Sequence, residues 1–282
     1  MTTPTGYKLT YSTMFNPPDA LHRQFEDALT RVRATFGRTH PMWIDGAPRT
    51  AASTFELRSP IDRDWLLGRF QQGSAGDAQD AVAAARRAFP AWAATPWRER
   101  LRLLRRAAAL IEERVYDLSA ALAVEVGKNR MESIGEVQET ADLITWYCDQ
   151  MEQNDGFVKQ LPNDPLEGFV SRNSTRLKPY GAWVVVAPFN FPVALACAPI
   201  AAALATGNTV IFKVASDTAL SGALLMEVLR DAGLPAGVVN HVTGPGATVG
   251  QALVEHPDVA GITFTGSYEV GMAIAARFAT GR

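Results

Sequence analysis

Apolar segments of strand length alternate with segments of helix length from residue 181 onward, and this alternation most constrains the fold. Four such segments are predicted strands, and the first two are almost continuously apolar, as expected of strands that are buried on both faces. They lie at residues 183–187, 209–212, 238–242 and 260–264. The helical segments between them lie at residues 192–205, 220–229 and 248–255. Parallel strands need such crossover helices, so the pattern predicts an α/β fold with a parallel sheet.

The sequence before this sheet is predicted to be mainly helical. Asp77 is a candidate N-cap for one helix, and Thr95 followed by a proline is typical of the start of the next. Further helices are expected at residues 118–126, ending at Gly127, and at residues 132–152. The second helix has many arginines, which we interpret as a solvated face rather than an anion site. These are Arg98, Arg100, Arg102, Arg105 and Arg106.

Two segments outside the helices are predicted to contain short strands. Residues 42–44 form an apolar triplet before an Asp-Gly turn. Residues 153–178 are polar, contain three prolines and have short alternating runs, which predicts a β-hairpin or an extended excursion from the compact body.

Composition narrows the function classes. The net charge of −2 gives no electrostatic reason to expect a nucleic acid or an anionic membrane as partner. Two cysteines are too few for a disulfide framework, and the first 20 residues lack the apolar core of a signal peptide. The longest apolar stretch, residues 191–205, is shorter than a membrane span and contains two prolines. We therefore expect a soluble protein of the cytoplasm.

Candidate site residues follow the carboxyl ends of the predicted strands, the edge at which open parallel sheets bind ligands. Asn190, within the sequence PFNFP, could donate a hydrogen bond to a developing oxyanion, or could simply cap a helix. Lys213 could contact a ribose hydroxyl or a phosphate, although surface lysines are common. Two glycine-containing turns, GPGATVG at 244–250 and FTGSYEVG at 264–271, could approach a pyrophosphate with unpaired N–H groups. The first is not the usual Rossmann spacing, and each motif alone is weak.

In their order along the chain, PFNFP, ATGNTVIFK, the Gly-rich turn and FTGSYEVG resemble the aldehyde dehydrogenase superfamily, over residues 40–282. The resemblance implies a Rossmann-like NAD(P)-binding domain in which Asn190 stabilises the oxyanion. It also implies that Lys213 holds the adenosine ribose. The other positions that it places around the cofactor are Val186, Ala187, Pro188, Phe189, Gly246, Gly250, Phe264, Gly266, Ser267 and Val270.

Position 216 departs from the common pattern of the superfamily. Many members that prefer NAD have a glutamate there, bound to the ribose 2′-hydroxyl, whereas this chain has Ser216. The serine lacks the negative charge that would repel a 2′-phosphate. We therefore expect a complete enzyme to accept NADP as well as NAD.

Within the superfamily, the long N-terminal lead, the segment HPMWIDG and the segment EVGKNRMES resemble the 1-pyrroline-5-carboxylate dehydrogenase subgroup. That resemblance implies the oxidation of L-glutamate γ-semialdehyde to glutamate in proline catabolism. It places Glu139 near the substrate amine, with an exposed helical carboxylate as the alternative. A dehydrogenase for another aldehyde remains a second possibility.

The residues for covalent chemistry are expected to lie beyond Arg282. Members of the superfamily use a cysteine nucleophile and a glutamate base, and the printed sequence has no Glu-x-Gly-Gly-Lys motif. Cys197 is interpreted as a buried apolar residue, and Cys148 has no adjacent base. No metal site is expected. The chain is therefore predicted to be an N-terminal fragment that is inactive alone, or else a dinucleotide-binding or assembly module without turnover.

Three parts are predicted: a helical part at residues 1–152, an oligomerisation hairpin at 153–178, and a Rossmann-like part at 179–282, incomplete at its C-terminus and without a catalytic domain. The full-length protein is expected to be a homo-oligomer, and the chain alone could expose apolar surface and aggregate.

Overall fold

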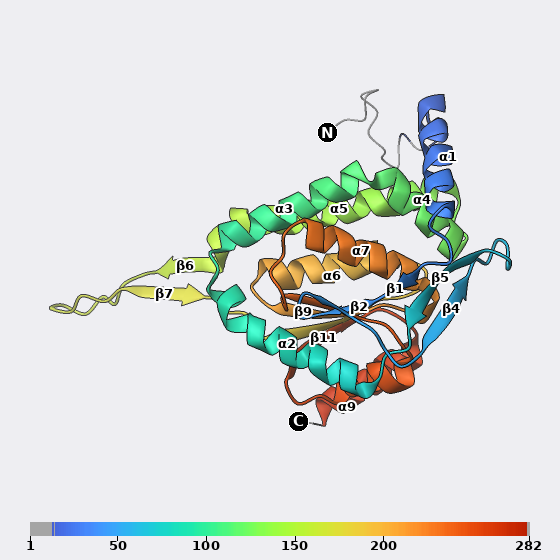
Figure 1. Cartoon of the computed structure of the whole chain (residues 1–282). Coiled ribbons are helices and arrows are strands. Elements are labelled where there is room, and N and C mark those ends of the chain that lie inside the picture. Colours follow the sequence, from blue (N-terminus) through green and yellow to red (C-terminus); the bar gives the residue numbers. More distant parts are fainter. Residues whose placement is uncertain (1–12, 14, 281–282) are drawn as a thin grey trace.

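Parallel strands form the centre of the sheet in the second half of the chain (Figure 1). The computed structural model describes residues 13 and 15–280. Strands β8 (Ala182–Val186), β9 (Thr209–Lys213), β10 (Val239–Val242) and β11 (Val259–Phe264) are mutually parallel where they pair, in the order β11-β8-β9-β10. All five residues of β9 are buried, which explains its continuous apolar sequence. The predicted α/β fold is confirmed.

The chain reverses its direction of travel across this sheet. It moves from β8 to β9 and β10, and then returns to place β11 on the other side of β8. Helices α6 (Ala194–Ala205) and α7 (Ala219–Asp231) lie on one face of the sheet, whereas α8 (Gln251–Glu255) and α9 (Tyr268–Ala279) lie on the other (Figure 1). Strands β8 and β11 therefore flank the topological switch point of the sheet, where α/β proteins bind their ligands.

Helices from the first half of the chain complete the two outer layers. The face that carries α6 and α7 is covered by α3 (Trp97–Glu113), α4 (Val115–Val126) and α5 (Arg130–Gln153), with α1 (Asp19–Arg33) packed on α4. Helix α2 (Ala75–Ala94) lies against β9 and β10 from the opposite face, beside α8. Each face has its own cluster of buried apolar side chains.

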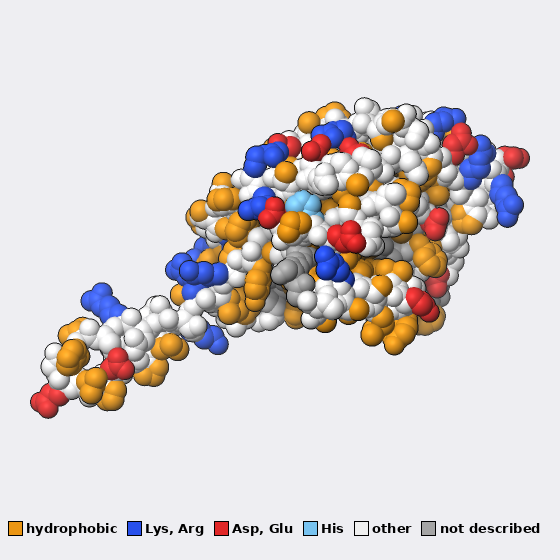
Figure 2. Space-filling model, turned by 90° about the horizontal axis from the view of Figure 1, so that it is seen from below, with side chains coloured by type: hydrophobic (Ala, Val, Ile, Leu, Met, Phe, Trp, Pro, Cys, Tyr) orange, Lys and Arg blue, Asp and Glu red, His pale blue; other side chains and the backbone are white. Residues whose placement is uncertain are grey.

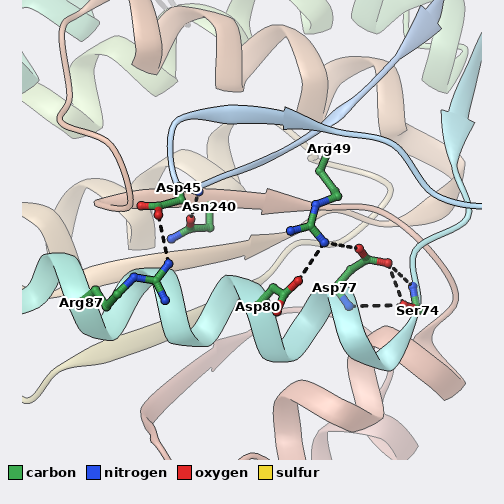
Figure 3. Close-up of polar contacts among 7 residues, drawn as sticks. All are labelled: Asp45, Arg49, Ser74, Asp77, Asp80, Arg87 and Asn240. Carbon is green, nitrogen blue, oxygen red and sulfur yellow. Dashed lines mark hydrogen bonds and ion pairs between the residues drawn. The ribbon is translucent and has the colours of Figure 1, made fainter.

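An N-terminal hairpin extends the parallel sheet with antiparallel strands. It consists of β2 (Met42–Ile44), the strand predicted at those residues, and β3 (Ala47–Arg49), and β2 pairs with β10. Figure 3 shows how the hairpin is fixed: Arg49 pairs with Asp77 at 3.1 Å and with Asp80 at 2.8 Å on α2. The Asn240 side chain accepts a hydrogen bond from the backbone N–H of Asp45, which ties the hairpin turn to β10.

A second, smaller sheet contains β1 (Thr39–His40), β5 (Leu66–Gln71) and β4 (Thr54–Arg58), in that order. Strand β1 is parallel to β5, and β4 is antiparallel to it. This sheet has a buried centre, since Leu67 and Phe70 on β5 belong to the larger apolar cluster.

Two of the predicted helix caps were wrong. The N-cap of α2 is Ser74, and Asp77 is the third helical residue, whose carboxylate accepts hydrogen bonds from the backbone N–H and the hydroxyl of Ser74. This is a capping box, in which the cap and the third residue satisfy each other's donors. Thr95 is the C-cap of α2 rather than the N-cap of α3, because its hydroxyl and N–H both donate to the Ala91 carbonyl.

The interpretation of the α3 arginines as a solvated face was wrong for one of them. Arg100 is buried and donates to the carbonyls of Ala205 and Thr95, so it ties α3 to the end of α6. Its pKa is lowered by burial. Arg102 and Arg105, in contrast, form surface ion pairs with acidic side chains of α3 and α5.

The predicted hairpin extends away from the body of the molecule (Figure 1). Helix α5 is followed by the turn η1 (Asp155–Phe157) and by the antiparallel strands β6 (Val158–Leu161) and β7 (Asn173–Arg176). Figure 2 shows apolar side chains on this excursion. Those with large exposed areas are Leu161, Leu166, Phe169, Val170 and Leu177.

One expectation from the sequence falls partly outside the described residues. The expected lack of a signal peptide depends partly on residues 1–12 and 14, which lie outside the described residues. Residues 281 and 282 lie outside them as well. In the part that the structure describes, no helix has both the length and the apolar character to cross a membrane.

Candidate functional site

The strand register brings the predicted site segments to one edge of the sheet. Val186 is the Cα partner of Lys213 on β9 and of Phe264 on β11. Because the strands are parallel, the loops that follow these three residues leave the same edge. The backbone pairing continues past the strands, since Ala187 N–H donates to the Lys213 carbonyl and Thr265 N–H donates to the Val186 carbonyl. The PFNFP loop, the lysine and the FTGS turn therefore lie at one edge of the sheet, at the switch point.

The PFNFP loop presents its asparagine between buried prolines. Pro188 and Pro192 are buried, whereas Phe189, Asn190 and Phe191 are exposed. Asn190 does not cap α6, because the N-cap of that helix is Val193. Among the described residues, no hydrogen bond occupies the Asn190 amide. The amide is therefore free to donate to a ligand oxygen.

A buried carboxylate from another layer caps α6 instead. Glu136 Oε1 accepts hydrogen bonds from the backbone N–H groups of Val193 at 2.9 Å and Ala194 at 3.2 Å. Glu136 Oε2 pairs with Lys128 Nζ at 2.5 Å. The sequence reasoning missed both residues. A signal was present, because Glu136 lies among apolar and small side chains on the buried side of α5.

A second buried carboxylate caps α7 in the same manner. Glu125 of α4 accepts hydrogen bonds from the N–H groups of Leu220 and Ser221, at 2.7 and 2.9 Å, and from the Ser221 hydroxyl. Burial raises the pKa of Glu125 to about 7, against the lowering effect of these donors. The helical layer thus fixes the starts of both crossover helices that follow the site loops. Glu125 also went unrecognised, although it is the charged residue in an apolar helical run.

Lys213 is a desolvated cation at the site edge. Only 6% of the residue is exposed, and burial lowers its pKa while the nearby Asp217 carboxylate raises it. Within the described chain, its ammonium has no hydrogen-bond or ion-pair partner. A buried ammonium in this state favours a ligand that supplies hydroxyl or phosphate oxygens.

Ser216 begins the turn η2 (Ser216–Thr218) after β9. Its hydroxyl donates to the Gly244 carbonyl at 3.4 Å, so the position lies against the Gly-rich turn.

The Gly-rich turn differs in detail from the prediction. A π-turn, η3 (Gly246–Gly250), precedes α8, and the N–H groups of Thr248, Val249 and Gly250 all donate to the Pro245 carbonyl. These three amides are therefore not the unpaired donors expected from the sequence. A Cβ atom added at Gly246 or at Gly250 would have no other atom within 4 Å, so the backbone there is open to a ligand on that side.

A hollow of about 520 Å³ lies beside this turn, between α8 and the start of α2. The backbone of Gly244 packs closely against the segment that contains Gly73. The φ of Gly244 is +128°, and a Cβ atom there would lie 3.0 Å from the backbone of Gly73. The glycine is therefore required by close backbone approach.

The FTGS turn leads into an exposed helix. Ser267 is the N-cap of α9, and its hydroxyl accepts a hydrogen bond from Val270 N–H at 3.4 Å. Gly266 is constrained by the Phe264 ring, which lies 2.6 Å from where a Cβ atom would be. None of the described residues of α9 is buried.

The remaining candidates lie on helices. Glu139 is exposed, three residues after Glu136 on α5, and its role near a substrate amine stays a prediction. Cys148 and Cys197 are both buried, and burial raises their thiol pKa values to about 11 and about 12. At these pKa values both thiols are protonated at neutral pH, which disfavours attack on an aldehyde.

Comparison with known proteins identifies the family. The aldehyde dehydrogenase family profile matches residues 47–282. A 1-pyrroline-5-carboxylate dehydrogenase of Halalkalibacterium halodurans is 37% identical over 94% of this chain and 50% of its own length. The NAD-bound 1-pyrroline-5-carboxylate dehydrogenase from Thermus has a TM-score of 0.88 and 37% identity, over 96% of this chain and 52% of its own.

An NADP complex of the NADP-dependent glyceraldehyde-3-phosphate dehydrogenase from Bacillus halodurans is also similar. It has a TM-score of 0.79 and 35% identity, over 85% of this chain and 50% of its own. The chain spans about half the length of the relatives that it matches. The profile match over most of the sequence, together with the shared fold, shows that this chain belongs to the aldehyde dehydrogenase family.

Proposed function

We propose that this chain supplies the NAD(P)-binding half of an enzyme that oxidises L-glutamate γ-semialdehyde to glutamate. The observation that supports the proposal most is that the PFNFP loop with Asn190, Lys213 and the FTGS turn lie at one edge of the sheet, at the switch point. The similar proteins named 1-pyrroline-5-carboxylate dehydrogenase support the substrate. Cofactor binding, substrate and assembly into homo-oligomers are proposals for the whole protein.

The residues at this edge of the sheet fit a dinucleotide. Lys213 offers an unpaired, desolvated ammonium for the adenosine ribose, and the open backbone at Gly246 and Gly250 can accommodate a neighbouring ligand. The segment from Val186 to Phe189 lies where the nicotinamide side of the site is proposed. When bound, the nicotinamide would accept a hydride, which is chemistry that amino-acid side chains cannot supply.

Asn190 is proposed to stabilise the oxyanion that develops on the substrate carbonyl. Its exposed, unbonded amide can donate to that oxygen without first breaking a bond to the protein. The chain itself offers no nucleophile, because both of its thiols are buried and protonated. We therefore propose that residues 1–282 alone bind dinucleotide without turning over aldehyde. Aldehyde-dependent NADH formation by the purified chain would contradict this.

Ser216 is proposed to permit NADP as well as NAD. A side chain at this position lies beside the Gly-rich turn, and serine brings no charge against a 2′-phosphate. The Ser216→Glu variant is expected to bind NADP at least tenfold more weakly while its affinity for NAD changes less, because like charges repel. Titration calorimetry at one salt concentration measures both affinities. Exclusion of NADP by the wild-type chain, with NAD bound, would refute this assignment.

A further inference from the structure

The Lys128–Glu136 ion pair contacts the PFNFP loop on the C-terminal side of Asn190. Glu136 holds the N–H groups of Val193 and Ala194 through Oε1. Lys128, held by Oε2 of the same carboxylate, places its Nζ 3.3 Å from the centroid of the Phe191 ring. Phe191 is the residue directly after Asn190. Of the four residues that follow Asn190, all except Pro192 thus contact either the Glu136 carboxylate or the Lys128 ammonium.

The local sequence explains how Lys128 reaches this place. Helix α4 ends at Gly127, whose φ of +81° reverses the chain, and α5 begins after its N-cap Asn129. Lys128 lies in the short link between the two helices. Glu136 is two turns further along α5, so both partners face the start of α6.

The pair is built from desolvated groups. The side chain of Glu136 is 0% exposed and that of Lys128 is 10% exposed. A cation that is shielded from water attracts an aromatic face more strongly than an exposed one does. Phe191 is itself 39% exposed, so its ring would be free to move if the ammonium were absent.

We propose that the Lys128–Glu136 pair is a positioning device for Asn190. It acts through Phe191 and through the first turn of α6, and it contacts no substrate itself. This rests on the proposed function of Asn190 as the oxyanion donor. A preorganised donor contributes most when its backbone cannot move, since little reorganisation is then needed as charge develops.

Two substitutions disturb the Lys128 contact in different ways and keep the helix cap. Glu136→Gln keeps a carbonyl oxygen that can accept from Val193 and Ala194, but its amide group faces Lys128 without charge attraction. Lys128→Met removes the cation from the Phe191 ring and leaves the helix cap. Lys128→Arg keeps a cation and is the rescue variant. Arg102→Met, which removes an exposed ion pair on α3, is the matched control.

Backbone ¹⁵N relaxation of the 282-residue chain reports the effect. In the wild type, Asn190 and Phe191 are expected to have order parameters of about 0.85, the value for rigid backbone. Lys128→Met and Glu136→Gln are both expected to lower them below about 0.6, whereas Lys128→Arg and Arg102→Met leave them unchanged. Amide exchange at Val193 and Ala194 should stay slow in Glu136→Gln.

Unchanged order parameters at residues 189–191 in a folded Lys128→Met or Glu136→Gln variant would overturn the proposal. A loss of order spread evenly over α5 and α6 would overturn it as well, because that is the signature of general destabilisation. NAD titration of the wild-type chain is a separate readout. If the chain fails to bind NAD while the loop order depends on Lys128, the proposed function fails and the positioning contact stands.

Discussion

At the scale of single residues, His241 is the least satisfied side chain in the described part of the molecule. It lies on β10, fully buried, and neither ring nitrogen has a hydrogen-bond partner. Burial, assisted by His40, lowers its pKa to about 3. The imidazole is therefore neutral, and its neighbour is the Phe212 ring at 5.3 Å.

Replacement of His241 by leucine is expected to stabilise the protein. At pH 7.5 the free energy of unfolding should rise by about 1–2 kcal/mol, because buried polar groups without partners are removed. The wild-type histidine binds its proton more tightly in the unfolded chain than in the folded one. The titration of His241 therefore leaves the stability of the wild type unchanged above about pH 6.5 and lowers it as the pH falls toward 3.

The advantage of His241→Leu over the wild type should therefore grow between pH 7.5 and pH 5. Urea unfolding at both pH values measures this difference. Two results would contradict this prediction: a variant less stable than the wild type at pH 7.5, or a difference in unfolding free energy that does not change with pH. Either would show that the cost of burying the imidazole does not decide the stability at this position.

At the scale of helices and strands, substitution of two glycines in the helical layer is expected to change the stability in opposite directions. Gly127 ends α4 in the left-handed region, with a φ of +81°, whereas Gly135 lies inside α5 with open space around its Cα. Gly127→Ala is expected to destabilise the protein by about 1 kcal/mol, and Gly135→Ala to stabilise it by up to about 1 kcal/mol.

The same urea unfolding experiment tests both glycine substitutions. Because each variant adds one methyl group, the pair is its own control for size. Equal shifts of the unfolding midpoint in the same direction would contradict the assignment of the two backbone conformations.

The elements were predictable from the sequence where burial alone decides them. The runs around Val184 and Ile211 gave strands because these side chains are fully buried among apolar neighbours, whereas β11, around Ile262, is only partly buried. Gly127 gave a helix end because only a left-handed residue suits that position. The caps of α2 and α3 were mispredicted. At α2, Ser74 and Asp77 are both suitable N-cap residues, and only the chain direction before the helix decides between them.

The site was only partly predictable for a related reason. Asn190, Lys213 and the glycine turns follow strands directly, so their place at the sheet edge follows from strand order. Glu125 and Glu136 accept hydrogen bonds from backbone N–H groups about 60 to 100 residues away in sequence. Every residue except proline has such a group, so the sequence does not indicate which ones are bound. Such contacts depend on how the helical layer packs on α6 and α7.

At the scale of the whole molecule, the β6–β7 hairpin exposes apolar side chains far from the body (Figure 2). Phe169 and Val170 are 75% and 92% exposed. Both lie on the loop between the two strands, and exposed apolar side chains on a projecting hairpin favour association with other chains. The double variant Phe169→Ser, Val170→Thr is expected to lower the weight-average mass in solution without a change in unfolding midpoint. Light scattering at several concentrations measures it, and an unchanged mass distribution would contradict the role of the hairpin.

The proposed function depends most directly on the binding of a dinucleotide at the carboxyl edge of the sheet. Loss of one charge-assisted hydrogen bond costs about 1.5–3 kcal/mol, which corresponds to about 10- to 100-fold in affinity. The direct test is calorimetric titration of NAD into the wild-type chain, Lys213→Met and the exposed hairpin control Lys159→Met. We expect the wild type and Lys159→Met to bind alike and Lys213→Met to bind at least tenfold more weakly. Equal binding by all three chains, or no binding by the wild type, would contradict the account.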